Sequence, residues 1–179
     1  ASRRRASLSL LDSGVESEAV ETVDVLEAAE HVAEAVRLAR PGSPVRLRVE
    51  GVHADVRVPP GRLAQVIANL VENAADFSPP GGLVRIRVEC VDGEVPDPAV
   101  VLSVTDEGPG IPADVIGRIF DRFFSFRPGA DAGSHSGLGL AIVKAIVEGR
   151  GGAVSAANLP GRGARLEVRL PEPPYARFP

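Results

Sequence analysis

Three polar side chains in one segment have types and spacing that could bind a metal ion. Asn69, Asn73 and Asp76 follow one another at intervals of four and three residues, and in a helix such residues lie on the same face. The side-chain carbonyl of Asn is a hard oxygen ligand of the kind that Mg²⁺ accepts beside water and phosphate oxygens. The same spacing is typical of a solvent-facing polar stripe, so this segment alone leaves both interpretations open.

A carboxylate, Asp106, comes directly before a tight turn that contains Gly108, Pro109 and Gly110. A carboxylate can accept a hydrogen bond from an exocyclic amine such as the 6-amino group of adenine. The glycines would let the backbone approach a flat ring without a clash from a Cβ atom. The same Asp-x-Gly-x-Gly pattern also occurs as a plain turn, so it predicts a base-binding site only in combination with other segments.

Two further glycines, Gly137 and Gly139, open a predicted helix in the segment SGLGLAIVK (136–144). Exposed backbone N–H groups and the positive end of the helix dipole can hold phosphates at such a start. The glycine pattern differs from that of a dinucleotide-binding fold, and Lys144 does not follow a glycine as it would in a GK[ST] phosphate loop. The segment therefore indicates a phosphate site of a different kind.

Aromatic and small residues lie between the Asp106 turn and these glycines. Phenylalanines at one end and glycines with small polar residues at the other are typical of a flap that closes over a ligand. A core aromatic cluster is the alternative, and Phe120 is expected to pack in either case. The residues of this predicted flap are Phe120, Phe123, Phe124, Phe126, Gly129 and Gly133.

The elements that must position these residues can be predicted from hydrophobic periodicity and from turn residues. Together they predict an α+β fold, a two-layer α/β sandwich in which a mixed sheet of about five strands carries three helices on one face. The predicted strands are 45–51, 54–58, 83–92, 100–106, 152–158 and 164–170, and the predicted helices are 25–40, with Asp24 as its N-cap, 62–77 and 138–148.

Composition excludes several classes of protein. The chain has 179 residues and a net charge of −4, so no basic face suggests a nucleic-acid partner. Its longest apolar runs fall far short of the roughly 18 residues of a membrane span. Cys90 is the single cysteine and can form no internal disulfide. Because the chain contains no methionine, we expect it to be part of a longer polypeptide.

Taken in order, four segments resemble the N, G1, F and G2 boxes of the catalytic ATP-binding domain of sensor histidine kinases, within the gyrase–Hsp90–histidine kinase–MutL superfamily. They are NLVENAADFS (69–78), DEGPGI (106–111), FDRFF (120–124) and SGLGLAIVK (136–144). The resemblance covers roughly residues 45–171. It implies the Bergerat-type ATP-binding fold and the cofactors ATP and Mg²⁺.

The resemblance also implies an activity and its partners. The domain would donate the γ-phosphate of ATP to a histidine on a dimerisation domain absent from this chain, for relay to the receiver domain of a response regulator. We then expect residues 1–22 to be a linker or a remnant of a dimerisation helix, 23–171 the catalytic domain and 172–179 a tail. We also expect a mainly monomeric fragment that is the cytoplasmic part of an inner-membrane sensor protein.

Individual residues inherit roles from the same resemblance. Asn73 is the implied Mg²⁺ ligand and Asn69 its support, and these two with Arg122 and Arg127 form the predicted catalytic set. The predicted nucleotide-binding residues are Asn69, Asn73, Asp76, Asp106, Gly108, Gly110, Ile111, Phe120, His135, Ser136, Gly137, Leu138, Gly139 and Leu140.

The sequence departs from the family pattern in two ways. Many sensor kinases carry Lys or Arg three residues after the second Asn, where it can meet the terminal phosphates, but here that position is Asp76. The cation is therefore expected from Arg122, Arg127 or Lys144. No phosphoacceptor box is present either, since no acidic residue directly follows His31. We expect this chain to bind ATP without phosphorylating itself.

Two other functions were weighed against this one. ATP hydrolases of the superfamily place a Glu four residues before the metal-binding Asn to activate water. Here that position is Asn69, while Glu72 is adjacent to Asn73 and points elsewhere on the helix, which argues against hydrolysis. A nucleotide-binding pseudokinase or an anti-sigma-factor-like module, which would use the pocket to bind a protein, is the second alternative.

Overall fold

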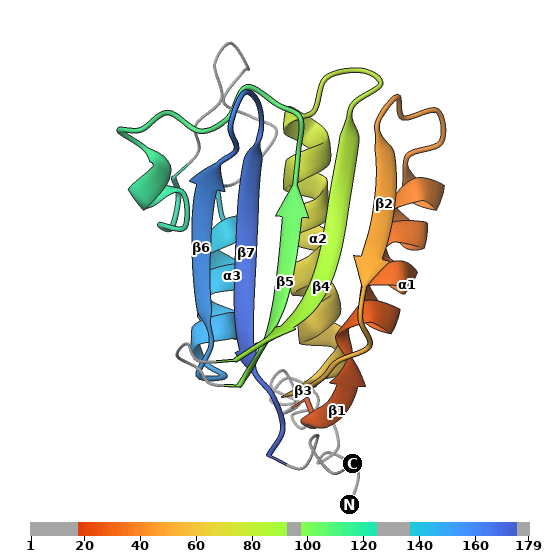
Figure 1. Ribbon diagram of the computed structural model, residues 1–179, viewed down its shortest axis with the longest axis vertical. Coiled ribbons are helices and arrows are strands. Elements are labelled where there is room, and N and C mark those ends of the chain that lie inside the picture. The colour runs from red at the N-terminus through yellow and green to blue at the C-terminus, as the bar shows by residue number, and fades with distance from the viewer. Residues whose placement is uncertain (1–17, 93–97, 125–136, 175–179) are drawn as a thin grey trace, which may run out of the picture.

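The computed structural model describes residues 18–92, 98–124 and 137–174, and a mixed sheet of five strands lies at its centre (Figure 1). The first two strands of the sheet are parallel and every other neighbouring pair is antiparallel. In spatial order the strands are β2 (Arg46–Gly51), β4 (Leu83–Val91), β5 (Ala99–Thr105), β7 (Ala164–Pro171) and β6 (Ala153–Asn158). The predicted sheet is confirmed.

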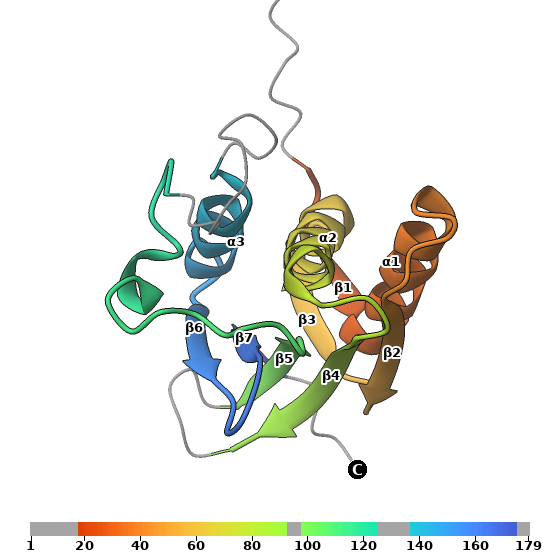
Figure 2. The same ribbon diagram turned by 90° about the horizontal axis from the view of Figure 1, so that it is seen from above.

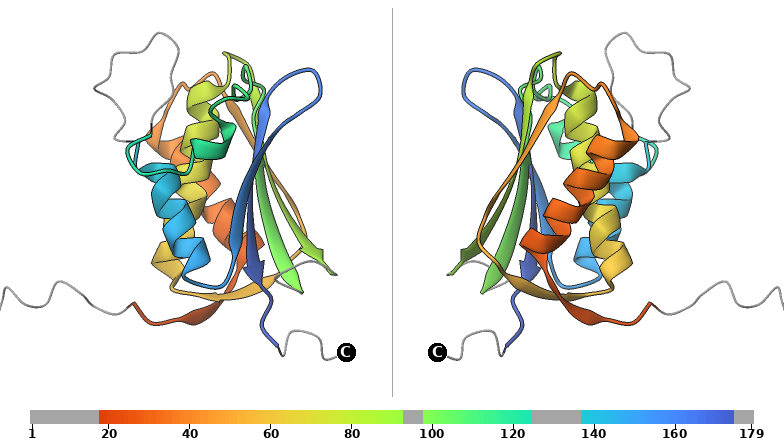
Figure 3. Two further views of the ribbon diagram at one scale, coloured as in Figure 1. Left: turned by 90° about the vertical axis from the view of Figure 1, so that its left-hand side faces the viewer. Right: turned by 90° about the vertical axis from the view of Figure 1, so that its right-hand side faces the viewer.

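Three helices cover one face of this sheet (Figures 2 and 3). Seen from above, α2 lies between the other two, and the edge-on views show all three on the same side of the strands. They are α1 (Val25–Ala39), α2 (Pro60–Phe77) and α3 (Gly139–Glu148). The predicted α/β sandwich with three helices on one face is therefore confirmed, and the described residues between β5 and α3 form a 3-10 turn, η1 (Ile116–Arg118).

The core forms where the apolar face of the helices packs on the apolar face of the sheet. Helix α2 buries residues at intervals of three and four, and β4 buries every second residue, so each element presents one apolar face. Full burial of a large aliphatic side chain contributes about 1.5–3 kcal/mol. The fully buried side chains of these two elements are Leu63, Val66, Ile67, Leu70, Val71, Val84, Ile86 and Val88.

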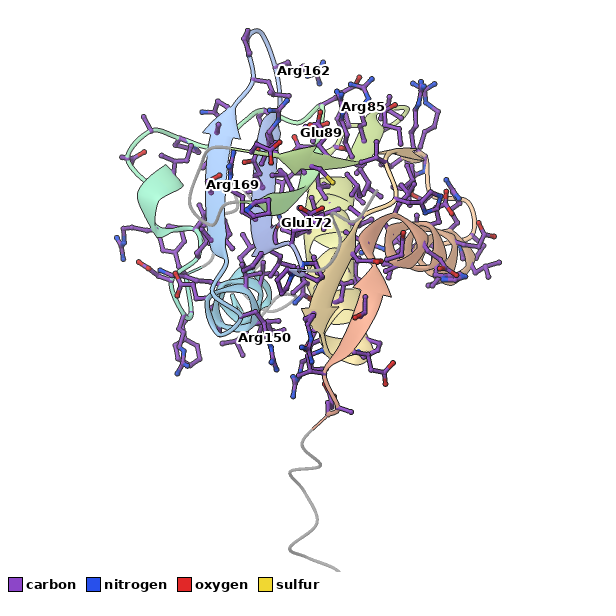
Figure 4. The ribbon with its side chains drawn as sticks, turned by 60° about the horizontal axis from the view of Figure 1, so that its bottom comes forward. Arg85, Glu89, Arg150, Arg162, Arg169 and Glu172 are labelled. Carbon is purple, nitrogen blue, oxygen red and sulfur yellow. The ribbon has the colours of Figure 1, made fainter. Side chains whose placement is uncertain are left out.

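The opposite face of the sheet carries charged side chains. Val101 and Ser103 of β5 point to this face, yet only 4% and 5% of their surface is exposed. Val101 lies in register between Glu89 of β4 and Arg169 of β7, and Figure 4 shows Arg85, Glu89 and Arg169 on these strands. Long side chains from the two neighbouring strands thus cover the small residues of β5.

A small second sheet lies at the N-terminal side of the domain. Strand β1 (Glu21–Asp24) pairs antiparallel with β3 (Asp55–Val58), so the predicted strand 54–58 forms but does not join the main sheet. No strand was predicted at β1, which begins before the predicted domain start at residue 23. Asp24 is the N-cap of α1 as predicted, since its Oδ1 accepts a hydrogen bond from the Glu27 amide at 2.8 Å.

The other element bounds lie close to the predicted ones. Helix α2 begins at Pro60 rather than at Arg62, because the fixed φ of proline suits the first turn of a helix, where its missing N–H costs nothing. Strands β4 and β5 pair as the predicted hairpin requires, while its turn, 93–97, lies outside the described residues. No helix in the described part of the chain is long and apolar enough to cross a membrane.

Candidate functional site

Asp106 is the buried carboxylate of the candidate site. It follows β5, and 8% of its surface is exposed. Its Oδ1 accepts hydrogen bonds from the Gly108 amide at 2.8 Å and the Ala164 amide at 3.2 Å, while its own amide donates to the Ala164 carbonyl at 3.0 Å. Among the described residues both bonds to the carboxylate fall on Oδ1, which leaves Oδ2 available to a ligand.

The environment of Asp106 also shifts its ionisation. Burial raises the pKa of the Asp106 carboxyl above its ordinary value of 3.8, and the hydrogen bonds from Gly108 and Ala164 act in the opposite direction. The charged form is therefore costly to bury when no ligand is present. A ligand amine that donates to Oδ2 would offset part of this cost.

The glycine turn after Asp106 packs too tightly for larger residues. A Cβ atom on Gly108 would lie 2.6 Å from the carbonyl oxygen of Phe77, at the end of α2, and 2.8 Å from Asp106 Oδ1. Gly110 has a φ of +82°, and a Cβ there would lie 2.9 Å from Asn158 Oδ1. Gly108 therefore lets the Asp106 turn approach the end of α2, the helix that carries the predicted metal ligands, and Gly110 lets the turn approach Asn158.

Asn158, at the end of β6, holds this turn from the other side and was missed by the sequence analysis. Its Oδ1 accepts from the Ile111 amide and its Nδ2 donates to the Ile111 carbonyl, both at 2.7 Å. One side-chain amide thus satisfies both backbone groups of Ile111, as a neighbouring strand would. An Asn at a strand end is a common surface residue, so its type and position carry no specific signal for this role.

We expect Asn158→Ala to loosen the Asp106 turn. The substitution removes two hydrogen bonds, each of which contributes about 0.5–1.5 kcal/mol, so the free energy of unfolding should fall by about 1–3 kcal/mol. Nucleotide affinity should fall as well, since Asp106 and Gly110 lie in the loosened segment. Urea unfolding and calorimetry with ADP measure the two effects. An unchanged free energy of unfolding would contradict the structural role.

Asn69 joins α2 to the start of α3. Its Nδ2 donates to the carbonyl oxygen of Gly139 at 3.1 Å, and a Cβ atom on Gly139 would lie 3.6 Å from Asn69 Cγ. Asn73, four residues on in α2, is half-buried like Asn69. The predicted metal ligand and the predicted phosphate-binding helix start are therefore held by neighbouring turns of two packed helices.

Gly137 connects the same helix start to the phenylalanine segment. Its φ is +64°, and a Cβ atom there would lie 2.9 Å from the Phe124 carbonyl oxygen. The Phe124 ring lies beneath the Arg118 guanidinium at 5.0 Å, a cation–π contact. Phe123 has a φ of 60°, and 77% of its surface is exposed.

The other predicted site residues fall into three groups. Ile111, Phe120 and Leu140 are half-buried and pack against the core, and Leu138 is half-buried at the start of α3. Arg122 is exposed and Lys144 is half-buried on α3. The remaining predicted residues lie outside the described part of the chain; they are Arg127, His135 and Ser136. Half of the predicted flap residues lie outside it as well, namely Phe126, Gly129 and Gly133.

Asp76 has a protein partner that the sequence did not predict. Its Oδ1 lies 2.9 Å from Nη1 of Arg40, which comes from the end of α1. Asp76 is thus paired with a residue of α1, the helix that lies on the other side of α2 from α3 (Figure 2).

The comparisons with known proteins give the family. A family model described as histidine kinase-, DNA gyrase B-, and HSP90-like ATPase matches residues 59–174, which is more than half of the chain and includes every predicted site residue. The chain belongs to this family. Within the family it is an ATP-binding domain of the sensor histidine kinase type, as its relatives and structural neighbours show.

Sensor protein ChvG of Rhizobium meliloti is 40% identical over 120 residues, which are 64% of this chain and 20% of ChvG. The mycobacterial sensor histidine kinase MprB has a solved structure with a TM-score of 0.75 and 35% identity, covering 86% of this chain and 99% of that one. Full-length ShkA in complex with AMPPNP has a TM-score of 0.70 and 28% identity, covering 86% of this chain and 31% of ShkA. The chain thus spans a fifth of ChvG's length.

Proposed function

We propose that this chain binds Mg-ATP and donates its γ-phosphate to a histidine on the dimerisation domain of the same full-length protein, for relay to a response regulator. The observation that carries the proposal is the link between Asn69 and Gly139 at 3.1 Å. It holds the asparagine helix against the start of α3, at the same end of the sheet as Asp106 (Figure 1). The residues that we propose as base acceptor, metal ligand and phosphate-binding helix start would therefore lie close to one another.

The adenine would lie against the Asp106 turn. Oδ2 of Asp106 would accept from the 6-amino group, and Gly108 and Gly110 would leave room for the ring beside the backbone. The amides at Gly137, Leu138, Gly139 and Leu140 would hold phosphates, assisted by the positive end of the α3 dipole. The nucleotide of ShkA is AMPPNP, an ATP analogue, which supports ATP as the ligand here.

The residues present fit a magnesium ion that is held mainly by the nucleotide. In the described part of the chain, no three His, Cys, Asp or Glu side chains cluster as a metal site. Asn73 would supply one oxygen ligand, and phosphate oxygens and water would complete the shell. When bound, Mg²⁺ would neutralise phosphate charge. Asn69 would fix the position of Asn73 relative to the amides at the start of α3.

Phosphoryl transfer needs positioning and charge neutralisation more than a covalent contribution from the protein. Asn69 offers no base to activate water, because its side chain is an amide that donates to Gly139. The site therefore supports transfer to a supplied histidine rather than hydrolysis. The predicted catalytic role of Arg122 and Arg127, the predicted monomeric state and the predicted place on the cytoplasmic side of an inner-membrane sensor are part of the same proposal.

Calorimetry tests nucleotide binding directly. We expect ADP and ATP to bind, GTP to bind more weakly because its 6-oxo group cannot donate to Asp106, and ATP to bind more tightly with Mg²⁺ than with a chelator. Binding of a protein partner without any measurable nucleotide binding would instead favour the anti-sigma-factor-like alternative.

A further inference from the structure

Asp76 is a negative charge in an unfavourable position. It lies in the last turn of α2, where the helix dipole disfavours an acidic side chain, and that turn contains no basic residue. Its side chain is 15% exposed. It also shares a helical face with Asn69 and Asn73, so a triphosphate bound along that face would approach a carboxylate. A cation at this point would reduce both unfavourable effects, the interaction of Asp76 with the helix dipole and its repulsion of phosphate.

Arg40 supplies a cation at this point, from a different helix. Its Nη1 lies 2.9 Å from Asp76 Oδ1. The sequence fixes this residue at the end of α1, because Pro41 cannot continue the helix and the turn that follows closes with a hydrogen bond from the Ser43 amide to the Arg40 carbonyl at 3.0 Å. The C-terminal ends of α1 and α2 lie at the same end of the molecule, where β5 also ends (Figure 1).

The guanidinium of Arg40 has capacity for a second anion. It carries five N–H donors in a planar fork, and within the described ranges its one side-chain hydrogen bond runs from Nη1 to Asp76. Its side chain is 36% exposed. Arg37, one turn earlier in α1, differs in this respect, because it donates to the Leu47 carbonyl at 2.8 Å and pairs with Glu34 at 3.1 Å.

We propose that Arg40 is a phosphate-binding residue of the nucleotide site, oriented by Asp76. The carboxylate holds one edge of the guanidinium, and the remaining donors bind a phosphate oxygen of the nucleotide. At this position of α2, the Asp76 carboxylate alone would repel phosphate, whereas the Arg40–Asp76 pair presents a cation that attracts it. This inference rests on the proposed function, and it assigns to α1 a cation that the sequence analysis sought in Arg122, Arg127 or Lys144.

The test compares Arg40→Gln, which keeps the Cβ–Cδ part of the side chain and a neutral N–H donor but removes the charge, with the wild type. Calorimetry would measure the affinities for ATP, ADP and adenosine. We expect ATP and ADP affinity to fall about tenfold, which corresponds to about 1.4 kcal/mol, and adenosine affinity to stay within about twofold. Arg40→Lys should recover part of the ATP affinity. The matched control Arg37→Gln should leave the ratio of ATP to adenosine affinity unchanged.

Each contrary result has its own meaning. Unchanged ATP affinity in Arg40→Gln, even with a lower melting temperature, would make the Arg40–Asp76 pair a purely structural link between α1 and α2. Equal losses for ATP and adenosine would mean damage to the whole pocket and would also overturn the inference. If the wild type binds neither ATP nor ADP, the proposed function itself fails, which is a separate outcome.

A measurement on the unaltered chain keeps the inference testable if Arg40→Gln does not fold. The Nε resonance of Arg40, assigned by comparison with Arg40→Lys, should shift when ADP is added and should not shift with adenosine. An Arg40 Nε resonance whose chemical shift does not change at a saturating ADP concentration would overturn the inference.

Discussion

Asp106→Asn is expected to weaken ADP and ATP binding by roughly tenfold to a hundredfold. A hydrogen bond to a charged group contributes about 1.5–3 kcal/mol, and the new amide would turn a donor toward the 6-amino group, which is itself a donor. For the same reason the preference for ATP over GTP should narrow, because the amide can donate to the 6-oxo group of guanine. Calorimetry with ADP, ATP and GTP measures both effects.

Glu107→Gln is the matched control for Asp106→Asn. Glu107 is the adjacent carboxylate, it is exposed, and its Oε2 accepts from the Leu83 amide at 3.0 Å. Loss of its charge should leave ADP affinity within about twofold. Equal losses in the two variants would mean that the net charge of the turn, rather than Oδ2 of Asp106, determines binding.

Asp106→Asn should also change how the free energy of unfolding depends on pH. Because burial raises the pKa of Asp106 above 3.8 in the folded state, the stability that its neutral form contributes is fully present below the unfolded-state pKa and is lost as pH rises through the folded-state pKa. Without nucleotide, Asp106→Asn should therefore be at least as stable as the wild type at neutral pH. This advantage should shrink as the pH falls through the folded-state pKa toward 3.8 and should be lost below that value, which thermal unfolding across pH would show.

Asn73→Ala is expected to abolish Mg²⁺-dependent phosphoryl transfer. The side chain would supply a direct metal ligand, so the loss of ATP affinity should be larger with Mg²⁺ than with a chelator. Titration of ATP under both conditions, together with a transfer assay, measures the difference. Equal losses in the two conditions would make Asn73 a structural residue of α2.

Glu72→Gln provides the control on the same helix. Glu72 is exposed and adjacent in sequence to Asn73, but it lies about 100° away around the helix. Neither ATP binding nor transfer should change in this variant. A loss of transfer would indicate that Glu72 acts as a base, and this result would favour the alternative of an ATP hydrolase.

Local signals were enough to predict most of the fold and the main site segments. The Asp24 cap, the apolar period of α2 and the alternation of β4 are each set by residues close in sequence, and the structure confirms them. The order of the four motifs likewise predicted that the Asp106 turn, α2 and the start of α3 would meet. Contacts of Gly108 with Phe77 and of Asn69 with Gly139 bear this out.

The features that were missed depend on partners distant in sequence. Asn158 is 47 residues from Ile111 and Arg40 is 36 residues from Asp76, and nothing in either local segment indicates its partner. Strand β1 was missed for a similar reason, because a four-residue strand carries little periodicity and forms here by pairing with β3. These contacts and this strand pairing depend on tertiary packing, which overrides weak local preferences.

Transfer of phosphate in trans is the most direct test of the proposed function. The chain would be incubated with γ-labelled ATP, Mg²⁺ and the separately expressed histidine-bearing dimerisation domain of the full-length protein. The account predicts label on that domain as acid-labile phosphohistidine, no label on this chain, and little release of free phosphate. ATP that binds but leaves the acceptor histidine unlabelled, or that is steadily hydrolysed without it, would contradict the assignment as a histidine kinase domain.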